Sequence, residues 1–143
     1  MRGKQRKYDK AIVLLEETLR IRIMNYGPDH HSVASVLFSL GIMFDKRHEY
    51  HAAIRAYMDC LDIQRKIFGD DDETVAQTLT NIGIVQGNEG HLESAIECWE
   101  ESIHIYHKGG TKNEDPKIKD LLKQIHDARK LINDKQTKNE MLI

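Results

Sequence analysis

The chain repeats itself at an offset of 42 residues, and this repeat constrains its fold more than any other feature. The stretch YGPDHHSVASVLFSLG, residues 26–41, returns as FGDDDETVAQTLTNIG, residues 68–83. Five columns extend to a third copy and fall on apolar or small residues: Ala11, Ala53 and Ala95; Ile12, Ile54 and Ile96; Leu19, Leu61 and Ile103; Ile21, Ile63 and Ile105; Leu37, Leu79 and Leu121. A further column pairs Gly41 with Gly83. We therefore expect stacked copies of one supersecondary unit, each burying its apolar face against its neighbours.

Each copy carries two helical patterns. Apolar residues first recur at spacings of three and four, which is one face of a helix, at Val33, Leu37, Leu40 and Phe44. A short polar turn at 46–48 follows, and a second pattern then runs through Tyr50, Ala53, Ile54, Tyr57 and Leu61. The two prolines, at 28 and 116, stand near expected helix starts, and β-branched residues do not alternate anywhere. The sequence therefore predicts an all-α fold.

Glycine recurs in the middle of the first helix of each unit, at Gly41 and Gly83. Glycine in a helix interior costs about 1 kcal/mol relative to alanine, so its repetition indicates a use in packing. We expect Gly41 and Ala53 to lie where two antiparallel helices approach most closely. Tyr57 and Trp99 would fill the wider space beside that crossing.

The succession of large, small and aromatic positions resembles the tetratricopeptide repeat. It reads Leu37, Leu40-Gly41, Phe44, Ala53, Tyr57 and Cys60 in one unit, and Leu79, Ile82-Gly83, Gln86, Ala95, Trp99 and Ser102 in the next. Gln86 departs from the aromatic expected there. The period of 42 exceeds the usual 34, and residues 5–108 resemble the long repeats of kinesin light chains and nephrocystin-3-type proteins. His31 and Glu73 stand where those repeats have proline.

The resemblance implies a right-handed α-solenoid of antiparallel helix pairs, a tetratricopeptide superhelix. We predict a lone second helix of a truncated repeat at 1–28, complete units at 29–70 and 71–110, a C-terminal capping helix at 111–134 and a frayed tail at 135–143. The lone helix leaves two alternatives open: the chain is an excerpt of a longer array, or another chain covers the bare apolar face.

Composition limits the class of partner. The formal net charge is −2, which gives no general attraction to nucleic acid or an anionic membrane. No apolar run approaches the ~20 residues of a bilayer span. The two cysteines, Cys60 and Cys98, lack metal or redox spacing and fall on the packed stripes, so we expect inert thiols in the cytoplasm.

The search for catalytic and metal-binding patterns gives little. His104 with His107 and His48 with His51 lack further ligands at a recognisable spacing. The acidic run at 70–73 lacks the pattern of a calcium loop, and acidic residues before a helix favour its dipole. We expect no metal, no cofactor and no enzymatic activity.

In the repeat family the first helix of each unit lines the concave face, so the positions that the core pattern skips are groove candidates. They are Ser35, Phe38, Ser39, Ile42 and Asp45 in one unit, Gln77, Thr80, Asn81, Ile84 and Asn88 in the next, and Lys119, Lys123, His126 and Arg129 in the last helix. The alternative is a solvated helix face. Phe38 and Ile42 are apolar and favour a groove. Family resemblance implies that Asn81 holds a ligand backbone, and the basic residues suggest an acidic peptide.

The sequence thus predicts a scaffold that binds a peptide or partner protein in a concave groove, without catalysis. Phe38, Ile42, Thr80 and Ile84 stand where a carboxylate clamp needs lysine or asparagine, so we expect no clamp. The alternative function is self-association of the chain through the exposed face of its first helix.

Overall fold

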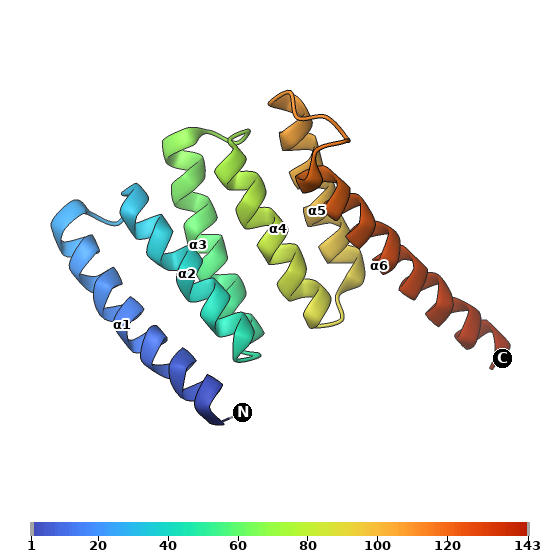
Figure 1. The fold of residues 1–143 in the computed structure, drawn as a ribbon, viewed down its shortest axis with the longest axis horizontal. Helices are drawn as coiled ribbons and strands as arrows, with labels where there is room; N and C mark the ends of the chain where they lie inside the picture. The colour runs from blue at the N-terminus through green and yellow to red at the C-terminus, as the bar shows by residue number, and fades with distance from the viewer. Residues whose placement is uncertain (1, 143) are drawn as a thin grey trace.

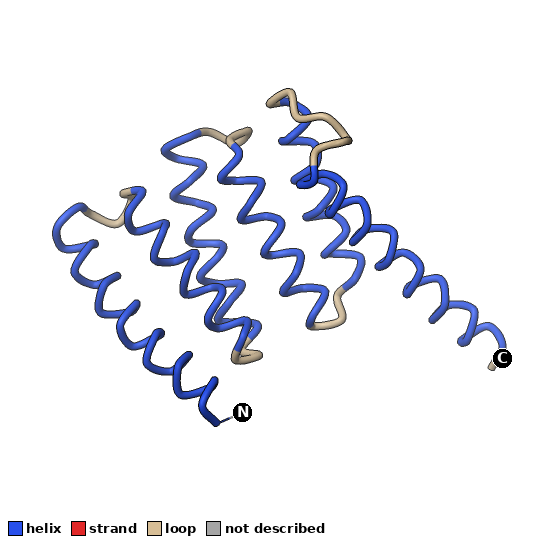
Figure 2. The backbone as a smooth tube through the Cα atoms, viewed as in Figure 1, coloured by secondary structure: helices blue, strands red, loops and turns tan. Residues whose placement is uncertain are grey.

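The computed structural model describes residues 2–142 and consists of six helices. The helices lie beside one another in chain order, from α1 to α6 (Figure 1), and the described residues contain no strand (Figure 2). Their bounds are Arg2–Tyr26 (α1), His31–Lys46 (α2), Tyr50–Phe68 (α3), Glu73–Asn88 (α4), Leu92–Lys108 (α5) and Pro116–Met141 (α6). The all-α solenoid predicted from the repeat is confirmed.

The 42-residue period is a period of the structure. The helices α2 and α4 begin at His31 and Glu73, and α3 and α5 begin at Tyr50 and Leu92, so both pairs of starts are 42 residues apart. Within each unit the two helices run antiparallel and are joined by a short turn (Figure 1). The most extensive packing lies within the pairs α2–α3 and α4–α5.

Side-chain caps fix where the first helix of each unit begins. The backbone N–H of Thr74 donates to the Asp72 carboxylate at 2.9 Å, and the N–H of Lys117 donates to Asp115 at the same distance. At α2 the cap is a histidine, since the N–H of Ser32 donates to His30 Nδ1 at 3.1 Å. Each cap satisfies an N–H that the first helical turn leaves unpaired.

The repeated glycines lie directly beneath the aromatic rings. A Cβ atom on Gly41 would stand 2.5 Å from the Tyr57 ring, and one on Gly83 would stand 2.4 Å from the Trp99 indole. The expected close approach is present, but the ring itself occupies the space that a methyl group would need, rather than lying beside the crossing. Both rings are buried.

An exposed ion pair recurs with the repeat. The Lys66 ammonium lies 3.3 Å from the Asp29 carboxylate, and Lys108 lies 3.2 Å from Asp71. Both partners are displaced by 42 residues between the copies. Each pair links the end of the second helix to the segment before the first helix of the same unit. Exposed pairs contribute little free energy, so they mark the repeat more than they stabilise it.

The last helix departs from the period by one residue. Helix α6 begins 43 residues after α4, because the connection at 109–115 is three residues longer than the one at 69–72 while α5 is two residues shorter than α3. The buried residues of α6 are Ile118, Leu121, Ile125 and Ala128, which stand 43 residues after Val75, Thr78, Ile82 and Val85. Leu121 therefore takes the position of Thr78, and its predicted alignment with Leu37 and Leu79 is wrong by one residue.

The predicted frayed tail is helical through Met141, which corrects the expected end of the cap at 134. Its side chains at 133–142 are exposed, and the end of α6 projects away from the other helices (Figure 1). Extending a helix that is already nucleated adds one hydrogen bond per ordered residue. Lysine, glutamine, glutamate and methionine favour this extension.

Candidate peptide-binding groove

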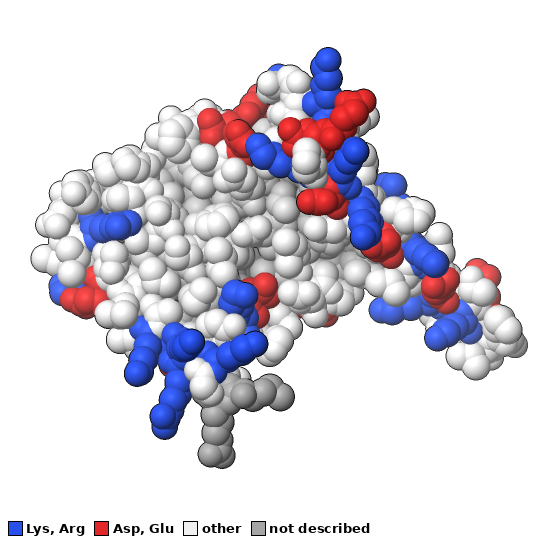
Figure 3. Space-filling model, in the orientation of Figure 1, with Lys and Arg blue, Asp and Glu red and all other residues white. Residues whose placement is uncertain are grey.

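The face formed by α2 and α4 is uncharged. Residues 32–44 and 74–88 contain no aspartate, glutamate, lysine or arginine. In the space-filling view, charged side chains gather near the N-terminus, at the top of α5 and along α6, and they leave the middle of this face free (Figure 3). Serine, threonine and carboxamide side chains provide most of its polarity.

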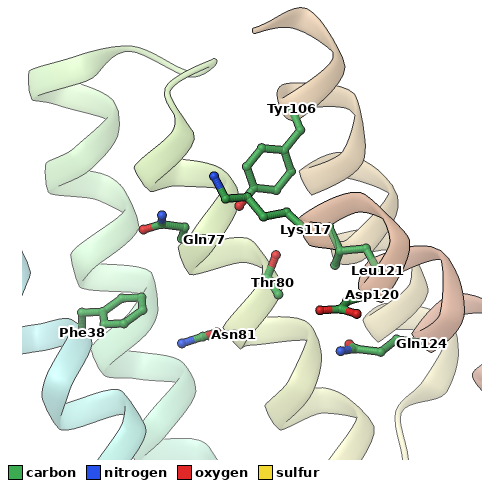
Figure 4. A pocket seen from close by; sticks show the side chains of 9 residues that line it. All are labelled: Phe38, Gln77, Thr80, Asn81, Tyr106, Lys117, Asp120, Leu121 and Gln124. Carbon is green, nitrogen blue, oxygen red and sulfur yellow. The ribbon is translucent and has the colours of Figure 1, made fainter. Parts of the chain in front are cut away.

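A cavity of about 310 Å³ lies at the centre of this face, between α4 and α6 (Figure 4). We call it the central cavity. Its lining combines one aromatic residue of α2, three polar residues of α4, one aromatic residue of α5 and four residues of α6: Phe38, Gln77, Thr80, Asn81, Tyr106, Lys117, Asp120, Leu121 and Gln124. The helices α2, α4 and α6 therefore all contribute to one site.

Two further cavities adjoin the central one. The N-terminal cavity, about 380 Å³, lies between α2 and α4 and is lined by His31, Ala34, Ser35, Phe38, Ser39, Gln64, Phe68, Thr74 and Gln77. The Trp99 cavity, about 390 Å³, lies between α4, α5 and α6 and is lined by Ile84, Gly87, Asn88, Leu92, Trp99, Gln124, Asp127, Ala128 and Leu131.

Shared lining residues join the three cavities into one groove. Phe38 and Gln77 border both the N-terminal and the central cavity. Gln124 borders both the central and the Trp99 cavity. The groove thus crosses α2, α4 and α6, and apolar side chains line both of its ends, Phe38 and Phe68 at one end and Leu92 and Trp99 at the other.

Packing behind the groove holds Phe38 and Asn81 in place. The rings of Phe38 and Tyr57 meet edge to face with centroids 5.6 Å apart. The Asn81 side-chain amide donates to the Tyr57 hydroxyl at 3.4 Å, a long hydrogen bond. Burial raises the pKa of Tyr57 to about 12, so this hydroxyl keeps its proton. Asn81 therefore retains capacity for a further hydrogen bond.

Thr80 lines the central cavity, but its polar atoms serve the fold. Its hydroxyl donates to the backbone carbonyl of Ala76 at 2.9 Å, and its own carbonyl accepts from the Trp99 indole N–H at 3.1 Å. The hydroxyl also lies 3.1 Å from that of Ser102. Thr80 therefore joins α4 to α5 and offers a ligand mainly its methyl group.

Gln124 has the opposite character. Its side-chain oxygen Oε1 is buried and has no hydrogen-bond partner among the described residues. A buried polar atom left unpaired costs about 1–3 kcal/mol. Because the residue borders two cavities of the groove, a ligand that donates a hydrogen bond there would remove this cost.

The structure brings most of the predicted groove residues together. Those that line the cavities are Ser35, Phe38, Ser39, Gln77, Thr80, Asn81, Ile84 and Asn88. Ile42 instead packs against the core, and the Asp45 carboxylate accepts from the Asn88 amide at 3.1 Å.

The predicted basic residues of α6 do not line the three cavities. These are Lys119, Lys123, His126 and Arg129, and all four are exposed. Arg129 pairs with Glu100 of α5 at 3.4 Å. The physical reason is the extra residue before α6, which rotates the helix by about 100° relative to the expected register. Other residues of α6 thereby turn toward the groove.

Sequence reasoning missed several residues of α5 and α6 that line the groove, among them Tyr106, Lys117, Asp120, Gln124 and Asp127. The signal that could have identified those of α6 is the length of the loop before Pro116. The Lys117 ammonium lies 2.6 Å from the Glu73 carboxylate and 5.9 Å from the centre of the Tyr106 ring. The hydrogen bond and charge of Glu73 raise the pKa of Lys117.

The remaining observations concern the cysteine thiols, metal ligands and membrane-spanning helices. Burial raises the pKa of the Cys60 and Cys98 thiols to about 11, so both are protonated at neutral pH. Within residues 2–142, no group of three or more histidine, cysteine, aspartate or glutamate side chains is placed to hold a metal ion. Among the same residues, no helix is long and apolar enough to cross a bilayer.

Solved structures share this arrangement of helices. The crystal structure of BtubC (BKLC) from P. vanneervenii superposes with a TM-score of 0.81 at 21% identity, covering 91% of this chain and 52% of that chain. The crystal structure of the nearly identical tetratricopeptide-like repeats of a putative kinesin light chain from Podosopora anserina gives 0.78 at 18% identity, covering 99% and 67%. A crystal structure of a variant of those repeats gives 0.75 at 18% identity, covering 89% and 60%.

These likenesses show the fold, and the chain spans about half the length of BtubC. No curated protein sequence matches the chain. The sequence profile of the tetratricopeptide repeat matches residues 1–66 and 46–108, which together cover most of the chain. The chain belongs to the tetratricopeptide-repeat family.

Proposed function

We propose that this chain is a protein-interaction scaffold that holds an extended peptide segment of a partner protein in the groove across α2, α4 and α6. The observation that carries the proposal is the continuity of three cavities through Phe38, Gln77 and Gln124. An extended chain advances about 3.3 Å per residue, so a short segment would contact several helices at once. Binding would occur without catalysis, with neither cofactor nor nucleic acid.

The chemistry of the groove suits a peptide backbone. Asn81 and Gln124 present carboxamides, which can donate and accept hydrogen bonds, on neighbouring helices. The Gln124 oxygen is buried without a partner among the described residues, and a rotation of the side chain toward the cavity would let it accept from a backbone N–H. A reducing, cytoplasmic setting belongs to the same proposal, because both cysteines are free thiols.

The test compares binding with stability in two variants. Peptides selected from a displayed random library on the wild-type chain should bind Asn81→Ala and Gln124→Ala about tenfold or more weakly. The melting temperature of Gln124→Ala should stay the same or rise, because the change removes an unpaired buried oxygen. Asp59→Asn on the exposed surface of α3 is the control and should bind normally. Undiminished binding by both groove variants would exclude this groove as the site.

Self-association through α1 is a second candidate function. Leu14 and Ile21 are 68% and 44% exposed, whereas Ala56 and Ile63, which stand 42 residues later, are 6% and 5% exposed. In α3 those positions pack in the cluster formed with α2. Within residues 2–142 no helix covers this side of α1, and Val13 and Met24 are exposed nearby. Exposed apolar patches of this kind often mark interfaces between proteins.

Sedimentation of the chain separates this candidate from a monomeric scaffold. Self-association predicts a mass that rises with concentration and a return to the monomer in the variant Leu14→Asp. The matched variant Leu142→Asp, at an exposed position near the end of α6, should leave the mass unchanged. A monomer at high concentration would count against association through α1.

A further inference from the structure

We propose that the groove selects a donor-rich segment, in which a lysine or arginine stands beside a large apolar residue. We further propose that the connection at 109–115 sets this selectivity. The inference rests on the proposed function and specifies its ligand. The proposed ligand is cationic, whereas the sequence suggested an acidic peptide.

Helix α6 is shifted by one residue from the 42-residue register of the repeat. Three of the α4 residues that line the cavities are Gln77, Asn81 and Ile84. An offset of 42 residues would place Lys119, Lys123 and His126 at the corresponding positions of α6. The observed offset of 43 residues places Asp120, Gln124 and Asp127 there instead, and these three residues line the groove.

This register places two carboxylates along the groove. Asp120 lines the central cavity and Asp127 lines the Trp99 cavity. Among the described residues neither carboxylate takes part in an ion pair, whereas Lys117 is held 2.6 Å from Glu73. Residues 32–44 of α2 and 74–88 of α4 contain no lysine or arginine that could balance these two carboxylates. The unbalanced charge of the groove is therefore negative.

Hydrogen-bond acceptors follow one another along the groove side of α6. Gln124 stands between the two aspartates, and its oxygen Oε1 is buried without a partner among the described residues. The three residues thus offer a row of acceptors. A guanidinium, an ammonium or a backbone N–H can satisfy them, and a carboxylate cannot.

The Trp99 cavity at one end of the groove is lined mainly by apolar side chains. Side chains of Ile84, Leu92, Trp99 and Leu131 border the Trp99 cavity, together with Ala128. Gly87 also borders it, at the position where the preceding unit has Asp45, and a Cβ atom there would stand 3.7 Å from the Trp99 ring. A cavity of about 390 Å³ accommodates one leucine, methionine or phenylalanine side chain of a ligand. Asp127 at the same cavity would meet a neighbouring cation.

The probes are two fluorescein-labelled pools of nonapeptides with leucine, methionine or phenylalanine at the centre. The pools differ only in the flanking residues, which are lysine and arginine in one and aspartate and glutamate in the other. We expect the cationic pool to bind the full chain roughly three- to tenfold more tightly at low salt. High salt should weaken this preference, because exposed charges are screened.

The double variant D120N/D127N should lose the preference. The control D59N/D62N removes the same charge from the exposed surface of α3 and should retain the preference. Circular dichroism would establish that both variants remain folded. The single tryptophan, Trp99, reports occupancy of its cavity through the indole N–H resonance.

Equal or tighter binding of the acidic pool would overturn the proposed selectivity while leaving groove binding intact. Loss of the preference in D59N/D62N as well would overturn it too, since the attraction would then come from overall charge. If neither pool bound, both this inference and the proposed groove would fail.

Discussion

Single residues set how closely the helices approach. Gly41 and Gly83 each lie under a buried aromatic ring, at distances that exclude even a methyl group. This explains why glycine recurs at a helix interior, where its intrinsic cost is about 1 kcal/mol relative to alanine. The sequence predicted the close approach but could not show that the ring lies directly above the glycine.

Replacing Gly83 with alanine should destabilise the chain. The added Cβ would stand 2.4 Å from the Trp99 indole, so the ring must move, and it would strain its hydrogen bond to the Thr80 carbonyl. Overpacking of this kind costs about 1–3 kcal/mol, which exceeds the gain in helix propensity. Urea unfolding measures the change in the free energy of unfolding.

Gly3→Ala is the matched control, because a Cβ at that position meets nothing within 4 Å. It should leave stability unchanged or raise it by up to about 1 kcal/mol. If Gly83→Ala behaved like Gly3→Ala, the packing explanation of the repeated glycine would be wrong.

At the scale of helices, the sequence was most informative where units repeat. The starts of α2, α3, α4 and α5 follow the 42-residue period. Helix α6 was harder, because its apolar stripe includes Leu122 and Leu131 and is wide enough to fit more than one orientation. Only packing on α5 selects the narrower buried face, and the longer connection at 109–115 permits that orientation. Most of the predicted positions of α2 and α4 therefore line the cavities, and the predicted positions of α6 do not.

The last turns of α6 offer a test at this scale. Side chains at 133–142 are exposed and form no packed surface within the chain. Removing residues 136–143 should therefore change the free energy of unfolding by less than about 1 kcal/mol, as for most exposed positions. Circular dichroism should show a loss of helical signal, because these turns are helical.

A longer deletion provides the contrast. Truncation before Ile125 removes two of the buried residues of α6, Ile125 and Ala128. It should lower stability by about 2 kcal/mol or more. A large loss of stability from the 136–143 deletion would contradict this description of α6.

At the scale of the whole molecule, stability comes from contacts between neighbouring helices, as expected for a repeat array. Several ionisable side chains are enclosed by these contacts without a charged partner. Burial raises the pKa of Cys60 and Cys98 to about 11 from an ordinary value of 9.0, and that of Tyr57 to about 12 from 10.0. The folded state therefore binds protons that the unfolded state releases at lower pH.

Stability should consequently fall as the pH rises. The contribution of the two thiols is fully present below pH 9 and is lost progressively between about pH 9 and 11, followed by that of Tyr57 up to about pH 12. Urea unfolding at pH 7.5 to 10.5 measures this slope. A Cys98→Ala variant should show a shallower slope, and equal stability across this range would contradict the assigned burial of the three groups.

The central claim is that one groove across α2, α4 and α6 holds a peptide. Titration of isotope-labelled chain with a display-selected peptide, followed by NMR, tests it most directly. Binding in the groove should give the largest shifts at the side-chain amides of Asn81 and Gln124, the Trp99 indole N–H and the backbone around Phe38. Shifts confined to α1, α3 and the outer surface of α5, with these signals unmoved, would contradict it.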